Sequence, residues 1–69
     1  MIFYTIWKKH GDDITLIDEE PTLFTKGAAF KRAREMRKDL IYGTSDAIVV
    51  RKITEGSLDC IQWVFEPRE

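Results

Sequence analysis

Four segments of the chain are rich in β-branched and aromatic residues, a composition typical of β-strands. They cover residues 2–9, 14–19, 47–54 and 58–66. Gly11 lies in the short polar stretch between the first two segments, where a glycine readily adopts the positive φ of a tight turn, so these segments are expected to form a hairpin. Pro21 ends the second segment, because proline has no N–H to donate to a central β-ladder.

The hydrophobic period changes in the middle of the chain. Apolar residues recur there at intervals of three and four, the spacing along one face of a helix, at Ala29, Ala33, Met36 and Leu40, with Phe30 beside them. Thr25 is placed to cap the helix N-terminus, and Gly43 to follow the last turn as the C′ residue. The pattern predicts a helix over about residues 26–41.

The last two strand segments are expected to form a second hairpin. A two-residue loop at positions 55–56 matches opposite charges and apolar residues across the two strands. The resulting pairs are Lys52 with Asp59, Val50 with Ile61, and Ile48 with Trp63. The chain is thus predicted to be one α+β domain over residues 1–69, in the order ββαββ, with a four-stranded antiparallel sheet and one helix packed on one face. The order of strands within the sheet stays open.

Both faces of the predicted sheet carry apolar side chains, because successive residues of a strand point to opposite faces. In the last strand Trp63 and Phe65 belong to one face, whereas Cys60 and Val64 belong to the other. A single helix covers only one face. The second face is therefore expected to pack on a second copy of the chain or on another macromolecule, or to be a moderately apolar face without a function. We expect a homodimer, because a chain of 69 residues buries little apolar surface alone.

Composition excludes several classes of protein. The hydrophobic fraction of 43% and the charged fraction of 33% are those of a globular chain rather than a disordered one. A single cysteine forms no internal disulfide, which favours a reducing, cytoplasmic setting. No apolar run is long enough to span a membrane, and the apolar residues 2–7 lack the flanking features of a secretory signal peptide.

The net charge of −1 conceals a basic helix on an otherwise acidic chain. Residues 26–40 carry six basic and two acidic side chains, whereas residues 1–25 carry two and five. On a helical wheel Lys31, Arg34 and Lys38 form one outward stripe, with Arg37 on its flank; these four residues are called the basic stripe below. Such a stripe can bind an acidic protein or nucleic-acid phosphates, or simply form a solvated helix face.

The sequence contains no converging set of catalytic groups, and we expect a protein that is not an enzyme. His10 lies alone in a predicted turn, and Cys60 is expected to be a small apolar residue with Arg51 opposite it. No cofactor-binding or metal-binding motif is present. Trp7 is the best candidate for the anchor of an interface, since tryptophan is enriched in such positions.

These observations predict a small binding protein, of the kind typical among accessory proteins of phages, plasmids and bacterial operons. The leading hypothesis is a homodimeric protein-interaction module or inhibitor that presents Trp7 and the basic stripe to an acidic partner. The alternative is a nucleic-acid-binding protein that uses the basic stripe on phosphates.

Overall fold

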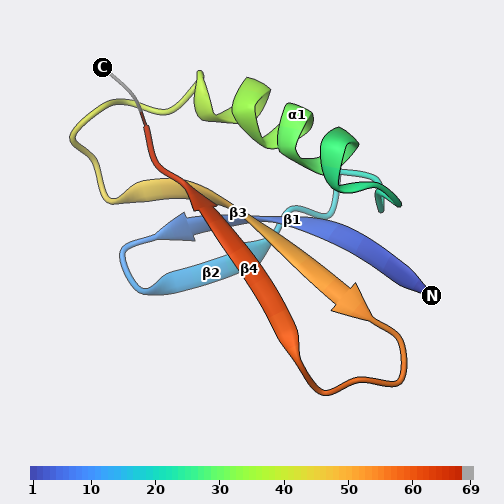
Figure 1. Cartoon of the computed structure of the whole chain (residues 1–69). Coiled ribbons are helices and arrows are strands. Elements are labelled where there is room, and N and C mark those ends of the chain that lie inside the picture. The colour runs from blue at the N-terminus through green and yellow to red at the C-terminus, as the bar shows by residue number, and fades with distance from the viewer. Residues whose placement is uncertain (68–69) are drawn as a thin grey trace.

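The computed structural model describes residues 1–67, so Arg68 and Glu69 of the predicted domain lie outside the described residues. Two antiparallel hairpins and one helix form two layers, with the helix lying across one face of the sheet (Figure 1). The elements are β1 (Ile2–His10), β2 (Asp13–Leu16), α1 (Lys26–Arg37), β3 (Asp46–Thr54) and β4 (Cys60–Phe65). The α+β class and the ββαββ order are confirmed. No helix among the described residues is long and apolar enough to cross a membrane.

The strand order is β2-β1-β3-β4, and every neighbouring pair is antiparallel. The two hairpins join through β1 and β3, which pair along nine residues each and form the centre of the sheet. The first hairpin closes at Gly11, whose φ of 61° confirms the predicted turn. The edge strand β2 is shorter than predicted, because the chain turns away after Leu16 and the Glu20 N–H donates to the Ile17 carbonyl.

The helix begins where the sequence predicts and ends earlier. The Thr25 hydroxyl accepts a hydrogen bond from the Ala28 N–H at 3.2 Å, which confirms the N-cap. The helix ends at Arg37 instead of residue 41, because the next three N–H groups bond to carbonyls three residues back and tighten the chain into turns. Gly43 has a φ of 87° but lies in the following loop, so its assignment as the C′ residue was wrong.

The core lies between the helix and one face of the sheet, which is called the covered face below. Ala29 and Ala33 are fully buried, and their small side chains allow the helix to lie close to the strands. They belong to one buried cluster with Tyr4 and Ile6 of β1 and Ile48 and Val50 of β3, and partly buried residues pack around it, among them Phe30, Met36, Leu40, Trp63 and Phe65. The predicted apolar stripe of the helix is thereby confirmed.

The predicted register of the second hairpin was wrong by two residues. Val50 lies opposite Trp63, and Ile48 lies opposite Phe65. The connection is longer than two residues: Ser57 donates its N–H to the Thr54 carbonyl, and Gly56 has a φ of 85°. This register brings both aromatic side chains onto the helix, and that burial outweighs an exposed Lys52–Asp59 pair, which contributes at most about 1 kcal/mol. A slip of two residues keeps every side chain on its predicted face.

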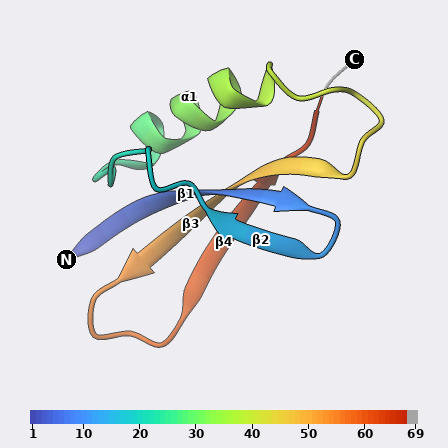
Figure 2. The ribbon, with the colours of Figure 1, turned by 180° about the vertical axis from the view of Figure 1, so that it is seen from behind.

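The opposite face of the sheet carries no helix (Figures 1 and 2). It consists of the odd-numbered residues of β1 and β3 and the even-numbered residues of β2 and β4, and it is called the open face below. The helix covers only one face, as expected, although Ala47 and Val49 in the middle of the open face are buried within the single chain.

Candidate functional site

The basic stripe lies on the outer side of α1. Lys31, Arg34 and Lys38 are exposed, and Arg37 is half-buried at the side nearest β4. Among residues 1–67 none of the four forms an ion pair with a carboxylate. Their charges are therefore available to a ligand.

Three aromatic rings lie beside the stripe, between the helix and β4. The Phe30 ring packs edge-to-face on both Trp63 and Phe65, with centroids 5.1 Å apart in each pair. The group Phe30, Trp63 and Phe65 is called the aromatic flank below. Because β4 is an edge strand, this flank borders the outer margin of the domain rather than its centre.

Cations stack over the aromatic flank. The Arg37 guanidinium carbon lies 5.6 Å from the Phe65 ring centroid, and the Arg34 carbon lies 6.0 Å from that of Phe30. Lys26 Nζ lies 5.2 Å from the Phe30 centroid and 5.0 Å from the Trp63 centroid. Such contacts hold the cations near the rings without neutralising them. The sequence analysis did not single out Lys26, and its only signal was its place in the first helical turn.

The other side of α1 is different in charge. Arg32 forms two hydrogen bonds to Glu20, at 2.9 and 2.6 Å, and lies 3.5 Å from Glu35. The hydrogen bond from Arg32 is the main cause that lowers the pKa of the Glu20 carboxyl. Lys31 lines a shallow cavity with Glu19 and Glu20 on this side. The strongly basic surface is thus the side of the helix that faces β4.

Trp7 lies on the open face, away from the basic stripe. Its indole N–H donates to the Thr5 hydroxyl at 2.9 Å, and the Arg51 guanidinium carbon lies 4.4 Å from its ring centroid. Arg51 Nε also donates to Gln62 Oε1 at 3.3 Å. The structure therefore separates Trp7 from the stripe by the thickness of the sheet, and one rigid partner surface does not contact both.

The Trp7–Arg51 stack was not predicted, because it depends on the pairing of β1 with β3. The two residues are far apart in the sequence, and the local pattern does not fix the strand order. Cys60 lies opposite Ile53 instead of Arg51, which corrects the expected neighbour. Cys60 is also exposed instead of buried, because it starts an edge strand on the open face.

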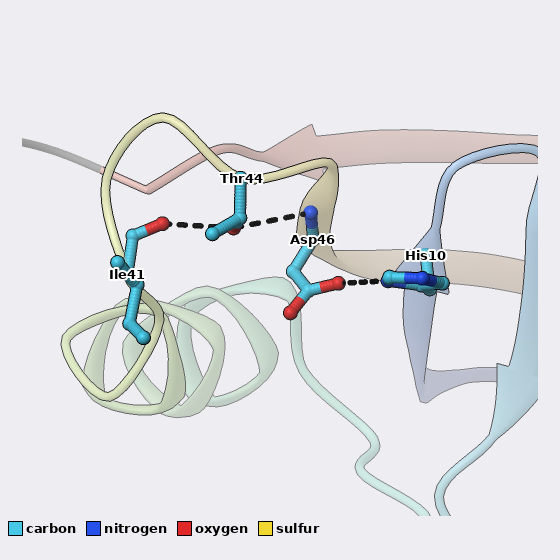
Figure 3. A network of polar contacts seen from close by, with 4 residues as sticks. All are labelled: His10, Ile41, Thr44 and Asp46. Carbon is cyan, nitrogen blue, oxygen red and sulfur yellow. Dashed lines mark hydrogen bonds and ion pairs between the residues drawn. The ribbon is translucent and has the colours of Figure 1, made fainter.

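His10 lies at the end of β1, where its Nδ1 contacts Asp46 Oδ1 (Figure 3). This hydrogen bond is the main cause that lowers the pKa of the Asp46 carboxyl. The Asp46 N–H donates to the Thr44 hydroxyl, which in turn donates to the Ile41 carbonyl at 2.8 Å. The network ties the end of β1 to the loop that precedes β3. In residues 1–67 no group of three or more potential metal ligands comes together.

No family model, curated protein or solved structure matches this chain. The function proposed next therefore rests on the geometry of these surfaces.

Proposed function

We propose that the chain is a non-enzymatic binding protein that docks an acidic protein surface on the basic stripe and the adjoining aromatic flank. The observation that carries this proposal is a set of cations that lie next to aromatic rings at the β4 side of the helix and form no ion pair within residues 1–67. Aromatic and arginine side chains contribute most of the binding energy in typical interfaces. We place this activity in the cytoplasm, in keeping with the single cysteine.

The distribution of charge supports an acidic partner. Asp12, Asp13 and Asp18 lie in or next to the hairpin that ends in the edge strand β2, whereas the aromatic flank borders the other edge strand, β4. Three strand spacings, about 14 Å, separate the two edges. A partner that approaches from the β4 side therefore meets the cations well before these carboxylates, an arrangement that favours association with an acidic surface.

The test is selection of binding peptides from a random displayed library, followed by affinity measurement with the best peptide. We expect selected peptides to be rich in Asp and Glu. Arg34→Glu combined with Lys38→Glu should leave the far-UV circular dichroism unchanged and weaken binding by at least about tenfold, because attraction becomes repulsion.

The matched control reverses two cations of β1, Lys8→Glu with Lys9→Glu, which lie two strands away from β4, and so changes the net charge equally. Binding to this control should stay within about twofold of the unmodified chain, since screening limits the effect of distant charges. Selected peptides without an acidic bias, or equal losses in the two variants, would contradict the proposal.

A second candidate is binding of nucleic-acid phosphates by the same stripe. The observation in its favour is again the distance of the hairpin carboxylates from the β4 side, because these groups are the ones expected to repel a phosphate backbone. The same two variants distinguish the candidates when a DNA duplex and a single-stranded oligonucleotide replace the peptide. Nucleic-acid binding requires that log affinity falls linearly with log salt, with a slope of about −0.7 to −0.9 per phosphate contact.

A further inference from the structure

The outer edge of β4 is left unpaired by the described chain. Within residues 1–67 this strand pairs with β3 on one side and with no strand on the other. Edge strands are usually protected by a short length, a charged side chain or a proline. The other edge strand, β2, is four residues long and begins with Asp13. In contrast, β4 has six residues, Cys60–Phe65, and none of them is charged or a proline.

The register of the sheet identifies the backbone groups that point out of this edge. The Glu55 N–H donates to the Met1 carbonyl at 2.9 Å, and this pair continues the register of β1 with β3. Backbone groups alternate in direction along a strand, so the odd-numbered residues of β3 bond to β1 and its even-numbered residues bond to β4. Val50 therefore bonds to Trp63, which lies opposite it. The residues of β4 that direct their N–H and C=O groups outward are Cys60, Gln62 and Val64.

Cations lie beside this edge on the helix side of the sheet. Lys26 Nζ lies 5.0 Å from the Trp63 ring centroid, and the Arg37 guanidinium carbon lies 5.6 Å from that of Phe65. Neither cation forms an ion pair within residues 1–67. Trp63 and Phe65 are two residues apart on one face, a separation of about 6.8 Å along a strand. The two cation–aromatic contacts thus follow the spacing of alternate strand residues.

We propose that the segment of the acidic partner that docks here is an extended strand, which pairs antiparallel with the outer edge of β4 and carries acidic residues at alternate positions. This inference rests on the proposed function and specifies the conformation and sequence pattern of the partner. Antiparallel pairing is the geometry of every strand pair in this sheet. In such complexes main-chain hydrogen bonds provide affinity, and alternate side chains provide specificity.

The two faces of β4 determine which side chains the added strand needs. Side chains directly opposite each other on one face have Cβ atoms about 4.5–5.5 Å apart. A carboxylate opposite Trp63 or Phe65 is therefore within reach of Lys26 or Arg37. The alternate side chains of the added strand lie on the open face, beside residues of β4 that carry no charge, and apolar side chains are suited to these positions.

Charge favours this partner over a second copy of the chain. A second copy that paired its own β4 antiparallel with this edge would place both helices on one side of the joined sheet. Lys26 and Arg37 of both copies would then lie beside the shared edge, and like charges across an interface oppose association. An acidic strand brings the opposite charge to the same position.

The first test compares two peptides of eight residues by fluorescence polarisation. One alternates Glu with Val, and the other has four Glu followed by four Val. The alternating peptide should bind at least about tenfold more tightly, because only this pattern places all carboxylates on the helix side of an added strand. In antiparallel pairing the Val N–H groups face β4, so N-methylation of the Val residues should abolish binding. N-methylation of the Glu residues should leave the affinity within about twofold, because those N–H groups face away from β4.

The second test alters the edge of β4 itself. Gln62→Pro removes an N–H that points outward, and an edge strand tolerates such a proline, so the far-UV circular dichroism should be unchanged. Binding of the alternating peptide should weaken by at least about tenfold. Gln62→Ala removes the side chain but keeps the N–H, and it should bind like the unmodified chain. Leu16→Pro is the control at the other edge, because the Ile17 N–H bonds to β1 and the Leu16 N–H therefore points outward.

The outcomes separate this inference from the proposed function. Equal affinities of the two peptides, equal effects or a reversed preference of the two N-methylation patterns, or equal binding by Gln62→Pro and Gln62→Ala would overturn the strand pairing. Failure of the alternating peptide to bind would also overturn it. The proposed function survives each of these results if peptides selected from the library are acidic. A dimer, at twice the mass of 8.1 kDa, that Gln62→Pro converts to a monomer would assign the edge to a second copy and overturn the inference.

Discussion

At the scale of single residues, the Glu20–Arg32 contact has the clearest consequence for stability. The Glu20 side chain is only 10% exposed and accepts two hydrogen bonds from one guanidinium. This contact joins the segment after β2 to the middle of the helix. It also removes Arg32 from the cations available to a partner, which leaves the basic side of the helix facing β4.

Glu20→Gln should lower the free energy of unfolding at neutral pH by about 1 kcal/mol, because a paired carboxylate is replaced by a neutral amide at a site where solvent partly screens the pair. The pKa of Glu20 is lowered in the folded chain from an ordinary value of 4.5. The contribution of the ion pair is therefore fully present above that value and is lost as the pH falls through the lowered pKa. Urea unfolding at a series of pH values measures both effects.

The unmodified chain should lose more stability on acidification than the Glu20→Gln variant does, and the two curves should converge at low pH. A constant difference between them at all pH values would mean that the contact contributes through packing instead of charge. Sequence analysis can relate Arg32 to Glu35, because helix geometry brings together residues three apart. It missed Glu20, since no local rule relates residues that are twelve apart.

At the scale of elements, the hydrophobic pattern does not determine where each helix or strand begins and ends. Loops and helix caps determine these boundaries. The predicted register of the β3–β4 hairpin assumed the shortest loop that matched charges. The observed turn at Thr54–Ser57 is followed by a hydrogen bond from the Asp59 N–H to the Ser57 hydroxyl, which lengthens the loop and shifts β4 by two residues. Packing of Trp63 and Phe65 on Phe30 then fixes the register.

Two glycine substitutions test how backbone conformation contributes to stability, one in the β3–β4 loop and one in the first turn of α1. Gly56→Ala should destabilise the fold by about 1 kcal/mol, because its φ of 85° lies in the left-handed region that a Cβ disfavours. Gly27→Ala should stabilise it by about 0.5 kcal/mol, since alanine has the higher helix propensity. An added Cβ meets no atom within 4 Å at either position, so the backbone alone determines both effects. Thermal unfolding measures the difference, and a shift of the same sign in both variants would contradict the explanation.

At the scale of the whole molecule, the sheet separates two surfaces of different chemistry. The helix side presents cations beside aromatic rings, and the open face presents apolar rows around Trp7 and Arg51. The two tryptophans divide accordingly, with Trp63 in the aromatic flank and Trp7 on the open face. Trp63 can thus serve as a fluorescent reporter of binding at the helix side.

Binding at the proposed helix surface should depend on salt. Raising the ionic strength from about 0.05 to 0.5 M should weaken binding of the selected acidic peptide, because screening shortens the range of charge attraction. Peptide titrations that follow Trp63 fluorescence in the Trp7→Phe variant measure this response. An affinity that stays constant over this range of salt would contradict an interface that depends on the charges of the basic stripe.

The sequence by itself determined the number and order of the elements, the N-cap at Thr25, and the face to which each strand residue belongs. These properties follow from local periodicity and capping, which require no knowledge of distant neighbours. Only the tertiary structure decided the strand order, the two-residue shift of β4, and the contact of Trp7 with Arg51. Those features depend on pairing between segments far apart in the chain, where packing of aromatic side chains on the helix and of β1 on β3 outweighs any local preference.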